Sequence, residues 1–168
     1  MSDTFDEISC PACHKPMKKI YLVNQKFNVD ICLEGCGGLF LDNRELKKID
    51  ENMEDIDPIL EQIKDREFQE VDSSVKRTCP MCGHIMVKNY SSHLGKVQID
   101  ECYNCGGKFF DHGELIKLRE EFATENDRIN AFNDYAKSIL NAANSEFKEK
   151  KTLGSMINDI IKNYKEFN

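Results

Sequence analysis

The chain has 168 residues, which is enough for one domain or for two small ones. Its formal net charge of −7 argues against the general attraction to phosphate that dominates non-specific nucleic-acid binding. No apolar run reaches the ~20 residues that a membrane-spanning helix needs, and residues 1–7 lack the basic start and apolar core of a signal peptide. We therefore expect a cytoplasmic protein with no membrane association.

The first predicted element is a knuckle, a tight turn between two cysteines, at Cys10-Pro11-Ala12-Cys13. Two strands are predicted after it, at residues 19–23 and 27–32. Apolar side chains alternate along the second of these, which is the period of a half-buried strand. The pattern therefore predicts a hairpin that returns the chain to the first knuckle.

A second knuckle follows the hairpin, from Cys32 to Cys36. Gly37-Gly38 comes directly after it and lets the backbone fold closely around the sulfurs, where a side chain would block N–H···S hydrogen bonds. A short third strand is predicted at residues 39–41. The segment as a whole places four cysteines at one end of a small sheet.

The same pattern returns later in the chain. A shift of 69 residues carries Cys10 and Cys13 onto Cys79 and Cys82. The same shift superimposes identical residues after the second knuckle, at Cys36/Cys105, Gly37/Gly106, Gly38/Gly107, Phe40/Phe109, Asp42/Asp111, Glu45/Glu114 and Leu46/Leu115. Cys32 needs a shift of 70 to reach Cys102, because the first copy has C-x3-C where the second has C-x2-C.

Two closely spaced cysteine pairs on either side of a hairpin are typical of a tetrahedral four-thiolate zinc site. Each repeat has only about 40 residues, a size at which a metal or disulfides usually supplement the core. Reduced metal ligands are favoured over disulfides in a protein that is not exported. The sequence therefore predicts two zinc ions per chain with eight ligands: Cys10, Cys13, Cys32, Cys36, Cys79, Cys82, Cys102 and Cys105.

A helix is predicted to begin after each third strand. Asp42 and Glu45 have the spacing of a capping box, and Asp111 and Glu114 repeat it. Paired acids also serve in general acid–base catalysis, with His112 as a nearby candidate, but capping explains the spacing more simply. A closed four-thiolate zinc site activates no water, so we expect no enzymatic activity.

Residues 50–75 are predicted to form an acidic, amphipathic helical linker. Residues 51–75 carry 9 acidic and 2 basic groups. Apolar residues follow one another at spacings of three and four from Ile49 to Ile63, which indicates one packed helical face. Pro58 is suited to the first turn of a helix that restarts there.

The second repeat is less acidic, since residues 76–118 carry 6 basic and 4 acidic groups. Its basic and aromatic side chains are candidates for a surface that binds single-stranded nucleic acid: Lys76, Arg77, Lys88, Lys96, Lys108, Tyr90, Tyr103, Phe109 and Phe110. The alternative is that the aromatic rings fill a small core and the lysines are solvated. Three histidines near the knuckles and the hairpin tip are expected to be solvated and not to replace a cysteine: His14, His84 and His93.

Amphipathic helices are predicted in residues 119–168. Apolar residues from Ile129 to Phe147 fall at spacings of three and four, and a second stripe runs from Met156 to Phe167. These faces must pack against each other, the linker, a second copy of the chain or a partner. The polar faces are not lysine-rich, which disfavours a membrane-surface role.

The motif C-P-x-C, followed by [VI]-D-x-C-x2-C-G-G-x-[FW]-[LF]-D-x-x-E-L, resembles the prokaryotic zinc-finger family named for its likeness to the zinc ribbon of transcription factor IIB. The resemblance covers residues 8–49 and 77–118. It implies a zinc-ribbon fold with the cysteines as ligands, and a link to transcription or nucleic acid. The chain departs from the family pattern in its first C-x3-C knuckle and in Phe40 and Phe109, where tryptophan is usual.

We therefore predict a small α+β protein in which two zinc ribbons, at 8–49 and 77–118, are joined by a helical linker at 50–75. A helical region at 119–168 follows them. The predicted function is that of a non-enzymatic adaptor or regulator that binds a protein partner, with RNA polymerase or another transcription component as the candidate.

Two other function classes remain open. One is binding of single-stranded DNA or RNA through the second ribbon. The other is a thiolate redox sensor or a rubredoxin-like iron protein, because four cysteines also suit iron. Self-association through the helices is compatible with each of these functions.

Overall fold

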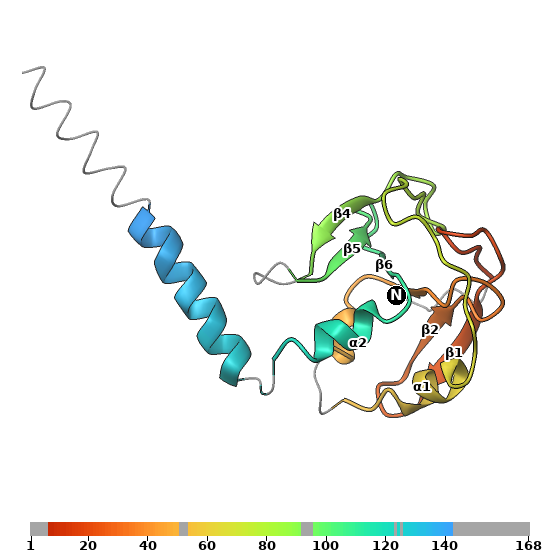
Figure 1. Cartoon of the computed structure of the whole chain (residues 1–168), viewed down its shortest axis with the longest axis horizontal. Helices are drawn as coiled ribbons and strands as arrows, with labels where there is room; N and C mark the ends of the chain where they lie inside the picture. The colour runs from red at the N-terminus through yellow and green to blue at the C-terminus, as the bar shows by residue number, and fades with distance from the viewer. Residues whose placement is uncertain (1–6, 51–53, 92–95, 123, 125, 143–168) are drawn as a thin grey trace, which may run out of the picture. The chain divides into compact units, whose positions relative to one another are not determined.

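The computed structural model describes residues 7–50, 54–91, 96–122, 124 and 126–142. The chain divides into two compact units, Met1–Glu125 and Asn126–Asn168 (Figure 1). The predicted apolar stripe from Met156 to Phe167 lies outside the described residues, as do Phe147 and His93.

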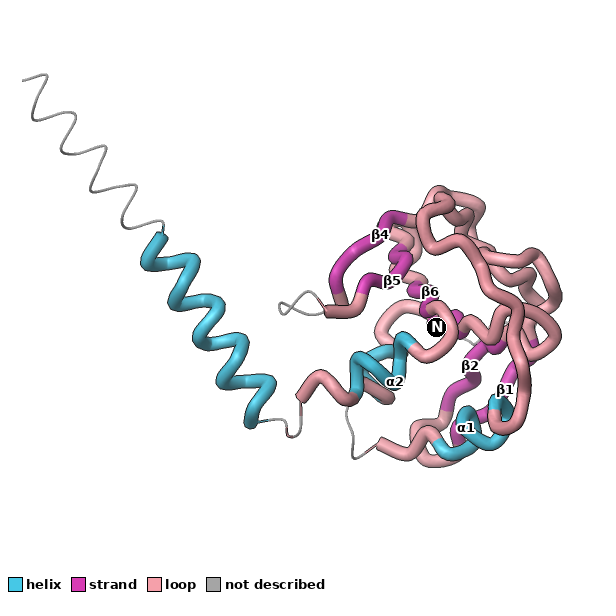
Figure 2. The backbone as a smooth tube through the Cα atoms, viewed as in Figure 1, coloured by secondary structure: helices cyan, strands magenta, loops and turns pink. Residues whose placement is uncertain are grey.

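Each cysteine repeat forms three short strands (Figure 2). In the first repeat they are β1 (Lys18–Leu22), β2 (Phe27–Ile31) and β3 (Leu39–Leu41). In the second repeat they are β4 (Val87–Tyr90), β5 (Gln98–Glu101) and β6 (Lys108–Phe110). The second hairpin begins at Val87, and Ile85 before it makes only an isolated bridge with Thr78.

All six strands belong to one antiparallel sheet, in the order β1-β2-β3-β6-β5-β4. Since β4, β5 and β6 repeat β1, β2 and β3, this order reads the same from either edge. The halves meet where β3 pairs with β6, and Phe40 lies opposite Phe109 at the middle of that pairing. The two repeats are therefore related by a pseudo-twofold axis that passes through this phenylalanine pair. The sequence predicted two ribbons, and the structure fuses them edge to edge.

Two glycines allow the halves to approach closely. A Cβ atom on Gly38 would lie 2.2 Å from Cζ of Phe109, and one on Gly107 would lie 2.5 Å from Cζ of Phe40. Any larger residue at either position would have to displace the ring. Each Gly-Gly turn thus receives the aromatic side chain of the other repeat.

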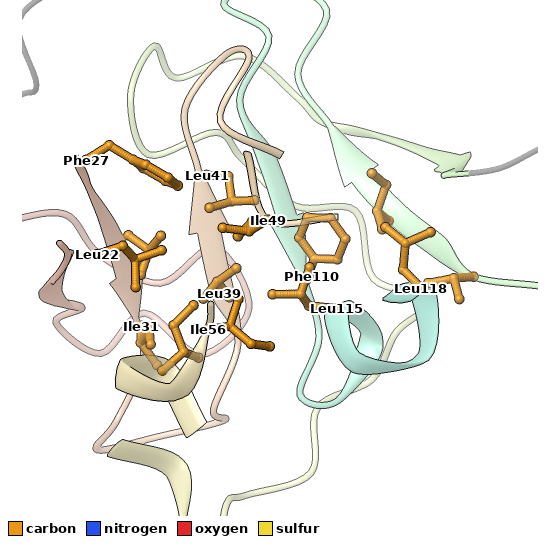
Figure 3. Close-up of a cluster of buried hydrophobic side chains, with 14 of the residues drawn as sticks. Leu22, Phe27, Ile31, Leu39, Leu41, Ile49, Ile56, Phe110, Leu115 and Leu118 are labelled. Carbon is orange, nitrogen blue, oxygen red and sulfur yellow. The ribbon is translucent and has the colours of Figure 1, made fainter. Parts of the chain in front are cut away.

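The larger hydrophobic core covers one face of the sheet (Figure 3). Two short helices pack on this face, α1 (Asp57–Ile63) and α2 (Glu114–Arg119). Its largest fully buried side chains come from both repeats: Leu22, Val29, Ile31, Leu41, Ile49 and Phe110. Since side chains alternate along a strand, Phe40 and Phe109 point to the opposite face, where they join a second cluster with the cysteines.

The linker is less helical than the sequence predicted. Among its described residues, α-helix is confined to α1, which has Pro58 in its first turn as expected. The apolar seam does pack in its described part, because Ile49 and Ile56 are buried in the larger core and Leu60 and Ile63 are packed partly against it. Helical geometry ends at Lys64, and Asp65 has a left-handed backbone (φ 56°), so the chain turns away toward the cysteine face.

The two predicted capping boxes are half formed. The Glu45 carboxylate accepts the backbone N–H of Asp42, and that of Glu114 accepts the N–H of Asp111, each at 2.7 Å. Helix α2 begins only at Glu114, with Gly113 at its N-cap and no side-chain cap. Asp111 is therefore not the N-cap, and its carboxylate makes ion pairs instead.

The described part of the second unit is a helix at residues 126–142. Its predicted apolar stripe is exposed at Ile129, Phe132 and Ile139. Within the described residues, none of the helices has the length and apolar character that crossing a membrane requires.

Candidate metal centres

The sheet holds two clusters of four cysteines, each formed by the knuckles of one repeat. In site 1, the sulfurs that lie within 4.8 Å of one another are those of Cys10, Cys13, Cys32 and Cys36. In site 2, they are those of Cys79, Cys82, Cys102 and Cys105. None of the eight forms a disulfide. The structure thus brings together the eight predicted cysteines in the predicted two groups.

The sulfur spacing fits a four-coordinate zinc ion. Two sulfur pairs in site 1 are 3.4 Å (Cys10–Cys36) and 3.3 Å (Cys13–Cys32) apart. In site 2 the equivalent pairs are 3.5 Å (Cys79–Cys105) and 3.4 Å (Cys82–Cys102) apart. Zn–S bonds of ~2.3 Å place the sulfurs of a regular tetrahedron about 3.8 Å apart, so only a small expansion would admit the metal.

Glycines shape the backbone behind the second knuckle of each site. Gly37 and Gly106 have left-handed backbones, with φ of 69° and 82°. The next residue then turns its N–H toward a sulfur, so that Gly38 donates to Cys36 and Gly107 to Cys105. Such N–H···S bonds stabilise a thiolate and orient it for a metal.

The longer knuckle of site 1 closes as tightly as its C-x2-C counterpart. Its extra residue is accommodated by Gly35, where a Cβ atom would lie 2.6 Å from Sγ of Cys13 and 2.8 Å from Sγ of Cys32. Only glycine leaves these two sulfurs their space. The departure from the family spacing is therefore compensated inside the same knuckle.

The sulfurs of each site alter one another's protonation. Hydrogen bonds with Cys10, and then with Cys36, lower the pKa of Cys32 to about 2, while hydrogen bonds with Cys32 and Cys36, and then burial, raise the pKa of Cys10. In site 2, the backbone N–H of His84 lowers the pKa of Cys82 to about 6, and burial raises that of Cys79. Some sulfurs thus favour the thiol and others the thiolate. A divalent cation would stabilise all four as thiolates.

A model of the transcription factor zinc-finger family matches residues 9–52 and 78–121, together just over half of the chain. The chain belongs to this family. The predicted resemblance and its two tandem copies are thereby confirmed, and family and clusters together support two zinc ions. The comparisons with curated proteins and with solved structures found no match.

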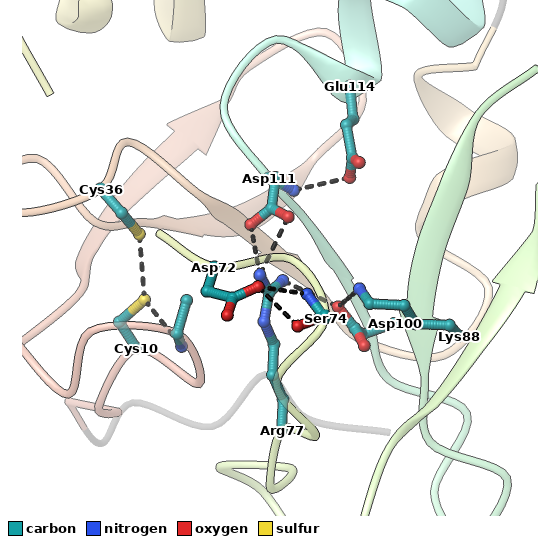
Figure 4. A network of polar contacts seen from close by, with 10 residues as sticks. Cys10, Cys36, Asp72, Ser74, Arg77, Lys88, Asp100, Asp111 and Glu114 are labelled. Atoms are coloured by element: carbon teal, nitrogen blue, oxygen red, sulfur yellow. Dashed lines mark hydrogen bonds and ion pairs between the residues drawn. The ribbon is translucent and has the colours of Figure 1, made fainter. Parts of the chain in front are cut away.

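In this zinc-finger protein, a buried arginine joins the elements of the second ribbon (Figure 4). Arg77, whose side chain is 2% exposed, donates to Asp100 at 2.7 Å and to Asp111 at 2.9 Å. Lys88 donates to Asp100 as well, at 2.9 Å. The Arg77 guanidinium also lies 4.8 Å from the centre of the Phe109 ring. The sequence placed Arg77 on a basic surface, and the structure places it in the interior.

The predicted basic and aromatic surface is accordingly much reduced. Phe109 and Phe110 are fully buried, as the alternative interpretation of the sequence expected. Lys108 forms an ion pair with Glu101. Tyr90 and Tyr103 are exposed, at 55% and 68%.

The histidines are not part of the clusters in the described chain. His14 and His84 are exposed, and His84 Nδ1 lies 3.1 Å from the carbonyl oxygen of Cys82. His112 packs against Phe68, with ring centroids 4.6 Å apart, and its Nδ1 lies where it would contact a Cβ on Gly37. Nothing in the sequence indicates this contact, because the three residues come from both ribbons and the linker.

Exposed apolar side chains gather along the outer strand of the second ribbon. We define the β4 patch as three such residues on or beside this edge strand, on the face to which Val87 points: Ile85, Val87 and Tyr103. Tyr103 belongs to it because Asn89 of β4 donates to its hydroxyl at 3.0 Å. The opposite edge differs, since the turn after β1 bonds to the linker through Gln25 and Asp55.

Proposed function

We propose that this protein is a non-enzymatic zinc-binding adaptor that acts through protein–protein contacts. The β4 patch is the observation that carries the proposal, because it exposes large apolar side chains on a sheet edge. Extended segments of partner proteins commonly add to such edges, and exposed aromatic residues commonly anchor protein interfaces. The zinc ions have a structural role, since a closed four-thiolate site offers no position for a reacting water.

The charges of the second ribbon support a protein partner over a nucleic acid. Arg77, Lys88 and Lys108 each pair with carboxylates. A cation that is already neutralised contributes little to the release of counterions from phosphate, which supplies most non-specific affinity for nucleic acid. The family description points to the transcription machinery, so RNA polymerase is the candidate partner that we would test first.

The test is binding of the zinc-loaded full chain to purified RNA polymerase. We expect Val87→Ser to weaken binding by about tenfold, since it removes apolar area from the β4 patch. Val23→Ser is the matched control, because Val23 is also an exposed valine but lies beside β1. Equal effects of the two substitutions, or no binding by the parent chain, would contradict the proposal. Salt-sensitive binding of single-stranded DNA or RNA would favour the nucleic-acid alternative.

A further inference from the structure

The two cysteine sites differ in their surroundings and not in their sulfur geometry. Two pairs of sulfurs are 3.3 and 3.4 Å apart in site 1, and the equivalent pairs are 3.4 and 3.5 Å apart in site 2. Because the repeats are related by the pseudo-twofold axis, each contact around site 1 has a counterpart position around site 2. Each site therefore serves as a reference for the other.

A lysine joins the two knuckles of site 1. Lys15, just after the first knuckle, donates from Nζ to the carbonyl oxygen of Glu34 in the second knuckle, at 2.6 Å. The counterpart of Lys15 is His84, 69 residues later. His84 instead contacts Cys82 of its own knuckle. The link between knuckles is therefore specific to site 1 among the residues that the structure describes.

The end of the linker forms a strap over site 1, which we define as residues 68–71. The Phe68 ring packs on Gly37, where a Cβ atom would lie 2.7 Å from its Cγ. The backbone N–H of Gln69 donates to the carbonyl oxygen of Gly35 at 3.1 Å, and Val71 packs against the cysteine cluster. The strap thus contacts the second knuckle at Gly35 and packs on Gly37, directly after it.

Site 2 has no equivalent strap in the described part of the chain. The residues one repeat after the strap, 137–140, are helical, whereas the strap itself has no regular secondary structure. The counterpart of Gly37 is Gly106, where the atoms nearest to a Cβ atom would belong to Asn43 of the other ribbon and not to a linker residue. A Cβ atom on Gly83, beside Cys82, would meet nothing within 4 Å.

The burial of the cysteines reflects this difference. Three of the four are buried in site 1, and only Cys13 is partly exposed. In site 2, Cys82 and Cys105 are both partly exposed. They come from different knuckles, so each knuckle of site 2 has one partly exposed cysteine.

We propose that site 2 is a reactive metal site, whose zinc exchanges and whose Cys82 and Cys105 thiolates react with soft, thiol-seeking reagents, whereas site 1 is a protected structural site. The reagents that it would take are carbon electrophiles and thiophilic metal ions. With iodoacetamide, the thiolate sulfur bonds to the methylene carbon, iodide leaves, and the metal loses one ligand. The inference depends on the sites alone and not on the proposed partner.

The test uses the zinc-loaded full chain with a limiting amount of iodoacetamide. Mass spectrometry of the peptides measures modification at each cysteine, and a colorimetric chelator measures released zinc. We expect Cys82 and Cys105 to react about tenfold faster than Cys10, Cys32 and Cys36, because accessible thiolates are the nucleophiles. One zinc ion should be released before site 1 is modified. Equal rates at both sites, or faster reaction at site 1, would overturn the proposal.

Two variants test the cause. Phe68→Ala loosens the strap and Lys15→Met removes the link between knuckles, so each should accelerate modification of site 1 and leave site 2 unchanged. Val75→Ala is the matched control, since Val75 is an exposed linker residue beyond the strap. Lys15 is exposed, so its substitution should not affect folding. If a variant accelerated cysteine modification equally at both sites, the role of these contacts would be refuted. The same would hold if neither Lys15→Met nor Phe68→Ala accelerated modification at site 1.

Discussion

Single residues account for the differences between the two ribbons. An ion pair is repeated in both, between Lys19 and Asp30 in the first and between Lys88 and Asp100 in the second, each at 2.9 Å. The second ribbon adds Arg77, whose counterpart 69 residues earlier is Ile8. Arg77 binds the carboxylate of Asp100 in β5 and that of Asp111 just after β6. Ion pairs therefore connect these elements in ribbon 2, whereas apolar packing occupies the equivalent place in ribbon 1.

We expect Arg77→Met to destabilise the zinc-loaded protein by about 3–5 kcal/mol, because it leaves the buried Asp100 without its closest cation. Lys137→Met is the control and should cost less than about 1 kcal/mol, since Lys137 and its partner Asp134 are both exposed and their ion pair is screened by solvent. Urea unfolding of both variants measures the difference. A similar cost for the two substitutions would show that burial of the Arg77 network adds nothing.

Two glutamates should give stability curves of opposite slope against pH. Burial raises the pKa of Glu114, so its ionised form opposes folding above that pKa, and the penalty fades as pH falls toward the unfolded value of about 4.3. Glu114→Gln retains an acceptor for the Asp111 N–H. We expect it to be at least as stable as the parent at neutral pH and to lose this advantage in acid.

Glu101 behaves in the opposite sense. Burial acts to raise its pKa, but hydrogen bonds from Lys108 and Asn89 outweigh burial and lower it. Its stabilisation is therefore present above about pH 4.3 and is lost as pH falls through the lowered folded pKa. Glu101→Gln should be less stable than the parent at neutral pH, and the difference should shrink in acid. Urea titrations across pH 3–7, roughly, check both variants, and slopes of the same sign would contradict these assignments.

At the scale of elements, helix α1 connects the linker to the sheet. Ile56 and Ile59 are buried on the larger core, and Leu60 and Ile63 are packed partly against it. A helix of seven residues is too short to be stable alone, so its conformation depends on this packing. Because α1 ends at Ile63, the residues that follow it are free of the helix and lead to the strap at site 1.

Ile59→Ala should destabilise the protein by about 2–4 kcal/mol, because it removes three buried carbon atoms from a packed core. The control is Glu61→Ala, on the exposed side of the same helix, which should change stability by less than about 0.5 kcal/mol. Thermal or urea unfolding measures both. If Ile59→Ala were as mild as Glu61→Ala, α1 would not be part of the core.

At the scale of the whole first unit, the two ribbons share one sheet and one core. The β3–β6 pairing and the reciprocal Phe40 and Phe109 contacts join structures that are each too small to be stable without help. Loss of one metal site should therefore weaken both repeats. From the sequence alone, each ribbon would be expected to fold as an independent unit, and loss of one metal site would then affect only its own repeat.

We expect Cys105→Ser to prevent zinc binding at site 2 and to reduce hydrogen-exchange protection in β2 and β3 as well as in β5 and β6. Structural zinc contributes on the order of 10 kcal/mol to folding in small sites, and β3 relies on β6 as its neighbour. Exchange measured by mass spectrometry, with the zinc-loaded parent as reference, provides the test. Full protection of β2 and β3 in the variant would show that the ribbons fold independently.

The sequence by itself determined the local features of this protein. Cysteine spacing and the 69-residue repeat predicted the two clusters, and alternation predicted the first hairpin and the third strand closely. Pro58 marked the start of α1. These features follow from the sequence because knuckles, hairpins and helix starts depend on residues that are near one another in the chain.

Only the tertiary structure decided how the repeats combine. The β3–β6 pairing, the interior position of Arg77 and the strap over site 1 each join residues from different segments. In the sequence, Arg77 resembles a surface cation and Phe68 an ordinary linker residue. The roles of Arg77 and Phe68 depend on which distant segments the sheet brings together. Local propensity and residue spacing carry no information about these long-range contacts.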